Sequence, residues 1–151
     1  MTGRLVFTVG NDLMGDDAAG PLLARMLEES PLEDWELLDG GSAPENYIYK
    51  VREMAPEQVV IVDTAEMELP PGEVRKVDRE QIAGLSLMTT HSLPLSYLME
   101  SIGEFVARVE MIGIQPGTVA FGYPVSAQVK SAVERVYGWL KQDTDGEVQE
   151  I

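Results

Sequence analysis

The chain has 151 residues, which is enough for one domain with a sizeable core. Its 26 aspartates and glutamates outnumber 11 lysines and arginines, and the formal charge of −15 excludes a phosphate-backbone binder and disfavours an anionic membrane partner. The sequence has no cysteine and a single histidine, so disulfides and cysteine nucleophiles are excluded and carboxylates dominate the reactive side chains. The apolar run at 5–9 is too short for a signal segment or a membrane span, and we expect a cytoplasmic protein.

Apolar strand-like runs alternate with stretches of helical periodicity, which predicts an α/β domain with about five mostly parallel strands. Strands are expected at 5–9, 35–38, 59–62, 73–77 and 109–114, with 73–77 at an edge of the sheet. Helices are expected over 19–27, after a capping box at 42–45, from about 94, and from an N-cap at Ser126. We expect one domain over 1–141 and an acidic, flexible tail over 142–151.

Carboxylates follow the first three predicted strands. The loop after the first strand contains Asp16 and Asp17, the second strand runs into Asp39, and the third ends at Asp63. Parallel strands present their carboxyl ends at one side of a sheet, where ligands bind, so these side chains are expected to converge on one crevice. The alternatives are structural: a favourable charge at a helix N-terminus for Asp16 or Asp17, and a tight turn at Asp39-Gly40-Gly41.

The single histidine, His91, precedes the predicted helix that starts near 94. A lone histidine is most simply a surface or core residue. One imidazole with two carboxylates is nevertheless a suitable donor set for a divalent metal, and it leaves positions open for a second partner.

Several fragments occur together in an order that is specific for one family. They are Val9-Gly10-Asn11, Met14-Gly15-Asp16-Asp17, Asp39-Gly40-Gly41-Ser42-Ala43-Pro44-Glu45-Asn46, Ile61-Val62-Asp63, Met88-Thr89-Thr90-His91 and Gly113-Ile114-Gln115-Pro116. With them the sequence resembles the maturation endopeptidases of nickel-iron hydrogenases, most of all the type that serves the hydrogenase of formate hydrogenlyase. The resemblance covers almost the whole chain and implies a single-domain three-layer sandwich, with a twisted sheet between helices.

The resemblance also implies an activity and a set of site residues. Such enzymes remove a short C-terminal extension from the nickel-loaded precursor of the hydrogenase large subunit, which is the expected partner. The positions that match the family's metal-binding residues are Asp17, Asp63 and His91. The nickel is held by substrate thiolates, so the protease itself supplies few ligands, and zinc or cadmium are possible surrogates. Asp39 matches a further functional carboxylate, and Asp39, Asp16 or the metal itself is a candidate for activating water.

Three other functions compete with this one. A dinucleotide site is disfavoured because no Gly-x-Gly-x-x-Gly follows the first strand and the nearby aspartates would repel a pyrophosphate. A conventional zinc protease is disfavoured because one histidine cannot supply a His-Glu-x-x-His motif. A non-catalytic, acidic metallochaperone-like module for a metallated partner would use the same ligands and stays open. We expect the protein to be a monomer in the absence of its partner.

Overall fold

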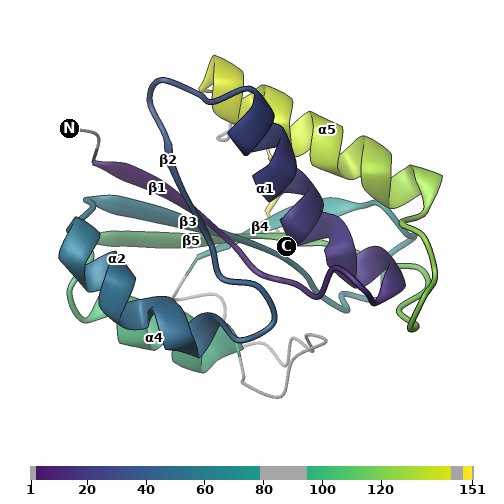
Figure 1. Cartoon of the computed structure of the whole chain (residues 1–151), viewed down its shortest axis with the longest axis horizontal. Coiled ribbons are helices and arrows are strands. Elements are labelled where there is room, and N and C mark those ends of the chain that lie inside the picture. Colours follow the sequence, from purple (N-terminus) through teal and green to yellow (C-terminus); the bar gives the residue numbers. More distant parts are fainter. Residues whose placement is uncertain (1–2, 79–94, 144–147, 151) are drawn as a thin grey trace.

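The computed structural model describes residues 3–78, 95–143 and 148–150. Figure 1 shows a central sheet with helices α1 and α5 on one side and α2 and α4 on the other. The three layers and the mostly parallel five-stranded sheet confirm the predicted α/β sandwich. In chain order the elements are β1 Arg4–Thr8, the short 3-10 helix η1 Gly15–Ala18, α1 Ala19–Glu29, β2 Glu36–Asp39, the 3-10 helix η2 Pro44–Tyr47, α2 Ile48–Met54, β3 Gln58–Thr64, β4 Val74–Asp78, α4 Leu95–Gly103, β5 Arg108–Ile114 and α5 Ala127–Gln142.

The strand order in the sheet is β2-β1-β3-β5-β4. The first four of these strands run parallel, and β4 pairs antiparallel with β5, so the predicted edge strand is indeed at an edge. Every residue of the central strand β3 is buried, which explains why its sequence is a continuous apolar run rather than an alternating one.

Two apolar cores lie on the two faces of the sheet. Because successive strand residues point to opposite faces, Phe7 and Ile61 pack toward α2 and α4, whereas Val6 and Val60 pack toward α1 and α5. None of the described helices has both the length and the apolar composition needed to cross a bilayer.

The two predicted helix starts that relied on capping have different outcomes. Ser126 is the N-cap of α5, and its hydroxyl oxygen accepts a hydrogen bond from the Val129 amide at 3.4 Å. The predicted capping box at Ser42 is wrong, because the N-cap of η2 is Ala43, one residue later, and no side chain caps this turn. The regular helix α2 begins only at Ile48.

The C-terminal segment differs from the expected solvated tail. Val148 is buried in the core beneath α1 and α5. The Lys76 amide on β4 donates to the Gln149 carbonyl at 2.8 Å, so residues 148–150 cover the outer edge of β4. Val148 therefore departs from the expected solvated segment, whereas Gln149 and Glu150 are exposed as expected.

Candidate active site

The carboxyl ends of β1, β2 and β3 lie side by side, as the carboxylate pattern requires. In the sheet register Thr8 of β1 stands opposite Asp39 of β2 on one side and opposite Val62 of β3 on the other. Asp63 is therefore one residue beyond the position that pairs with Thr8. The three strand ends are therefore neighbours in the sheet, which is the arrangement that the prediction required.

Asp17 lies in η1, directly before α1, and is almost completely buried. Its Oδ1 accepts a hydrogen bond from the Thr64 hydroxyl at 2.9 Å, and its Oδ2 accepts one from the Asn11 amide at 2.9 Å. Gly10 permits this close turn, because a Cβ there would lie 2.2 Å from the Asp17 carbonyl oxygen. These contacts fix the orientation of a buried carboxylate with neutral donors.

Asp63 is the next-to-last residue of β3 and is also buried. Its Oδ1 accepts a hydrogen bond from the Thr64 amide at 2.7 Å. Thr64 therefore contacts both carboxylates, Asp17 through its hydroxyl and Asp63 through its backbone. The sequence analysis missed Thr64, since nothing in its local pattern distinguishes it from an ordinary β-branched residue of a strand.

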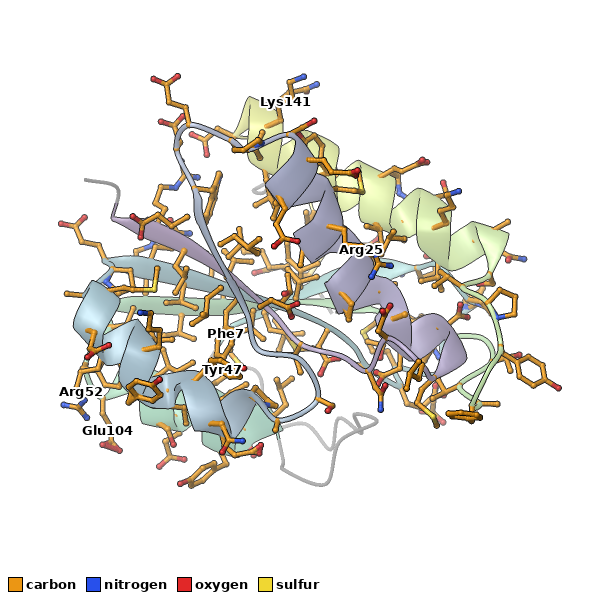
Figure 2. The ribbon with its side chains drawn as sticks, in the orientation of Figure 1. Phe7, Arg25, Tyr47, Arg52, Glu104 and Lys141 are labelled. Atoms are coloured by element: carbon orange, nitrogen blue, oxygen red, sulfur yellow. The ribbon has the colours of Figure 1, made fainter. Side chains whose placement is uncertain are left out.

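Asp39 has a different environment from Asp17 and Asp63. It is exposed, and its Oδ1 accepts hydrogen bonds from the Thr8 hydroxyl at 3.2 Å and the Gly41 amide at 3.0 Å. Figure 2 labels the buried Phe7 among the side chains of the sheet. A Cβ on Gly40 would lie 2.4 Å from the Phe7 ring, so the turn packs tightly against it. Close packing thus requires Gly40, and the positive φ of +58° favours glycine at position 41.

The carboxylates do not form a complete metal cage by themselves. Within residues 3–78, 95–143 and 148–150, no three aspartate, glutamate, histidine or cysteine side chains are grouped closely enough to hold a metal ion. His91, the predicted nitrogen ligand, lies outside the described residues. Of the three predicted metal ligands, the described residues therefore include Asp17 and Asp63.

Asp16 is fully buried, and its carboxylate binds a second loop. Its Oδ1 accepts from the Ser126 amide at 2.6 Å, and its Oδ2 accepts from the Ser126 hydroxyl at 3.0 Å. Oδ2 also accepts from the amides of Gly117 at 2.8 Å and Thr118 at 3.3 Å. A carboxylate at this place also favours the N-terminus of α5 electrostatically.

These contacts join two loops that are far apart in the sequence, the β1–α1 loop and the β5–α5 loop. The Asp16 amide donates to the Thr118 carbonyl at 2.9 Å, and a Cβ on Gly15, whose φ is +57°, would lie 2.5 Å from that same oxygen. Asp16 therefore positions the β5–α5 loop against the loop that carries Asp17. The sequence analysis did not find this role, because the partners are about one hundred positions away.

Known proteins share this fold. The solution structure of the endopeptidase HycI from Escherichia coli superposes with a TM-score of 0.90 at 44% identity, covering 99% of this chain and 96% of that one. The crystal structure of a [NiFe] hydrogenase maturation protease HycI from Thermococcus kodakarensis gives a TM-score of 0.82 at 31% identity, covering 93% and 91%. The class that the fold and the site define is thus the hydrogenase-maturating endopeptidases.

Sequence comparison gives the same result. The hydrogenase 3 maturation protease of Escherichia coli K12 is 47% identical over 139 residues, which is 89% of each chain. A putative hydrogenase maturation protease of Methanocaldococcus jannaschii is 30% identical over 145 residues, covering 90% of this chain and 85% of that one. Residues 21–142 match the family described as hydrogenase maturation protease. The chain belongs to the hydrogenase maturation protease family.

Proposed function

We propose that this protein removes the C-terminal extension of the nickel-loaded precursor of a NiFe hydrogenase large subunit. In this proposal Asp17, Asp63 and His91 bind the nickel that the precursor already holds, so that only a loaded precursor is cut. The observation that carries the proposal is the buried pair of carboxylates, Asp17 and Asp63, held by contacts to the same residue, Thr64.

The donor set suits this task. Two carboxylate oxygens and one imidazole nitrogen bind divalent transition metals and leave coordination positions for thiolates supplied by the substrate. The same set would accept zinc or cadmium as surrogates. Fixing the carboxylates before the substrate arrives lowers the ordering cost of binding, and such outer hydrogen bonds typically tune metal affinity.

Hydrolysis also needs a group that accepts a proton from water. The oxygen of that water bonds to the scissile carbonyl carbon while the carbon–nitrogen bond breaks, and the proton passes to the leaving amine. Asp39 suits this role better than Asp16, because Asp39 is exposed to water and its two hydrogen bonds, both to Oδ1, fix the orientation of the carboxylate. Asp16 is buried and would have to give up contacts to Gly117, Thr118 and Ser126.

The test is to incubate the protein with nickel-loaded and nickel-free precursor and to measure release of the extension by mass spectrometry. We expect the loaded precursor alone to be shortened by the wild type, and His91→Ala or Asp63→Asn to slow release at least about 100-fold. The control is Asp12→Asn, which changes an exposed carboxylate in the loop that leads to Asp17, and this variant should cleave at the wild-type rate. An unchanged precursor held in a stable complex would instead identify a binding module, and normal cleavage by Asp63→Asn would refute nickel recognition through this residue.

A further inference from the structure

Three large apolar side chains project into solvent beside the candidate active site. Leu13, Phe121 and Tyr123 are 61%, 76% and 59% exposed. Leu13 belongs to the β1–α1 loop, and the other two belong to the β5–α5 loop. The two loops touch, since the Gly122 amide donates to the Leu13 carbonyl at 2.9 Å. We call these three residues the apolar rim.

The two aromatic residues of the rim lie in an uncharged stretch of a strongly acidic protein. No charged residue occurs between Glu110 and Lys130, although the chain carries 26 acidic and 11 basic residues. Much of this stretch, from Gly117 to Pro124, lies at the surface. Exposed aromatic residues without interspersed charge are characteristic of protein interfaces, which are enriched in Phe and Tyr and depleted of Asp and Glu at their centres.

The backbone under the rim is fixed. The Asp16 carboxylate accepts hydrogen bonds from Gly117, Thr118 and Ser126, which bracket the loop that presents Phe121 and Tyr123. The Tyr123 amide donates to the Ala120 carbonyl at 3.2 Å, which adds a tight turn at the tip. An interface built on a preorganised loop loses less conformational entropy on binding.

The rim is joined through its backbone to the proposed nickel-recognition site. Leu13 and Asp17 lie on one short loop, and Asp16 between them holds the loop of Phe121. A protein seated on the rim would therefore have part of its surface beside Asp17. The occupant that meets this requirement is the protein whose metal and scissile bond must reach that carboxylate.

We propose that Leu13, Phe121 and Tyr123 are the docking surface for an apolar patch on the hydrogenase large-subunit precursor. This inference rests on the proposed function, because that function supplies the partner. Docking on the rim holds the body of the precursor, while Asp17, Asp63 and His91 recognise its nickel. The two contacts are separable: the rim contributes to binding of loaded and nickel-free precursor alike, and the metal-binding set discriminates between them.

The experiment compares Phe121→Ala with Tyr97→Ala as a matched control. Tyr97 is 54% exposed on α4, in the layer on the other side of the sheet from α1 and α5. We expect Phe121→Ala to raise the KM for nickel-loaded precursor and the Kd for nickel-free precursor by roughly 10- to 100-fold, with kcat within about twofold of wild type. Tyr97→Ala should leave all three constants unchanged, and both variants should unfold at the wild-type temperature, since each removes an exposed ring.

Three outcomes would overturn the proposal. One is an unchanged KM and Kd in both Phe121→Ala and the double variant Phe121→Ser/Tyr123→Ser. Another is an equal effect of Phe121→Ala and Tyr97→Ala. The third is a wild-type dimer in sedimentation that Phe121→Ala converts to a monomer without changing KM, which would assign the rim to a second copy of this chain.

Failure of the proposed function gives a different result. If wild-type protein cleaves loaded and nickel-free precursor equally well, nickel recognition is refuted, and a Phe121→Ala defect in KM still supports docking on the rim. If Asp63→Asn abolishes cleavage while Phe121→Ala binds the precursor normally, the nickel site stands and the docking surface is refuted.

Discussion

The two ends of the parallel strands hold their charged groups in different ways. At the amino end, Glu110 on β5 pairs with the Lys76 ammonium at 2.7 Å and accepts from the Gln58 amide group at 2.9 Å. Arg4, at the start of β1, lies over the Trp35 ring at 4.0 Å and pairs with Asp143. Charge at this end is matched by opposite charge or by an aromatic face.

At the carboxyl end, Asp16, Asp17 and Asp39 accept hydrogen bonds from backbone amides and hydroxyl groups, whereas the Asp12–Arg25 ion pair of the β1–α1 loop lies at the surface. Asp16 accepts from Ser126 and its neighbours, Asp17 from Thr64 and Asn11, and Asp39 from Thr8. A neutral donor fixes where a carboxylate points without cancelling its negative charge, so the group can still attract a cation. The difference suggests that changes at the amino end alter stability alone, whereas changes at the carboxyl end also alter cleavage.

The largest expected effect is at Asp16, which connects the carboxyl-end loops. Asp16→Ala should lower the free energy of unfolding by about 2–4 kcal/mol, because it leaves the donors of Gly117, Thr118 and Ser126 without their common acceptor. Urea denaturation followed by circular dichroism measures this free energy of unfolding. The control is Asp12→Ala, whose exposed pair with Arg25 is worth under about 0.5 kcal/mol. Equal stability of the two variants would contradict an anchoring role for Asp16.

A change at Thr64, also at the carboxyl end, tests the orientation of the Asp17 carboxylate separately from the stability of the fold. Thr64→Val keeps the β-branched shape but removes the hydroxyl that donates to Asp17. We expect cleavage of nickel-loaded precursor to slow about 10- to 100-fold, the usual effect of losing an outer hydrogen bond to a metal ligand. The free energy of unfolding should fall by only about 1 kcal/mol.

Thr64→Ser is the control for that prediction, because it restores the hydroxyl. It should recover cleavage to within a few-fold of wild type, as measured by mass spectrometry. If Thr64→Val and Thr64→Ser cleave at the same reduced rate, side-chain packing and not the hydrogen bond is responsible.

A change at Lys76 examines the amino end. The Lys76 and Glu110 side chains are mostly buried, so Lys76→Met should lower the free energy of unfolding by about 1–2 kcal/mol through the loss of a partner for Glu110. Cleavage measured under folding conditions should not change. Lys130→Met, at an exposed position of α5, is the matched control and should affect neither property. A clear loss of cleavage in Lys76→Met would break the distinction between the two ends.

The sequence was sufficient for the features that local pattern determines. Continuous burial of β3 follows from the run Val59-Val60-Ile61-Val62, and Asp63, directly after that run, lies at the carboxyl end of the strand. The N-cap Ser126 and the edge position of β4 follow from residue type and from the turn before the strand. Each depends on neighbours within a few positions.

Features that depend on distant segments could not be predicted. The hydrogen bonds of Asp16 to Ser126 and of Thr64 to Asp17 exist only after the strand order β2-β1-β3-β5-β4 brings their loops together. The burial of Val148 depends in the same way on the core beneath α1 and α5. An acidic composition around Val148 favours a solvated tail locally, and the apolar side chain is buried because long-range packing outweighs that preference.

The smallest expected effect is a gain in stability at the amino end. Ala55 caps the C-terminus of α2 just before β3, with a left-handed backbone (φ 51°, ψ 51°) that costs a residue with a Cβ more than it costs glycine. Ala55→Gly should therefore raise the free energy of unfolding by about 0.5–1 kcal/mol while keeping the hydrogen bond from its amide to the Val51 carbonyl. Ala127→Gly, in the first turn of α5, is the control and should give no gain. Because Ala55 lies away from the carboxyl-end loops, cleavage should be unchanged, and a stabilised variant that cleaved more slowly would show that the two ends are coupled.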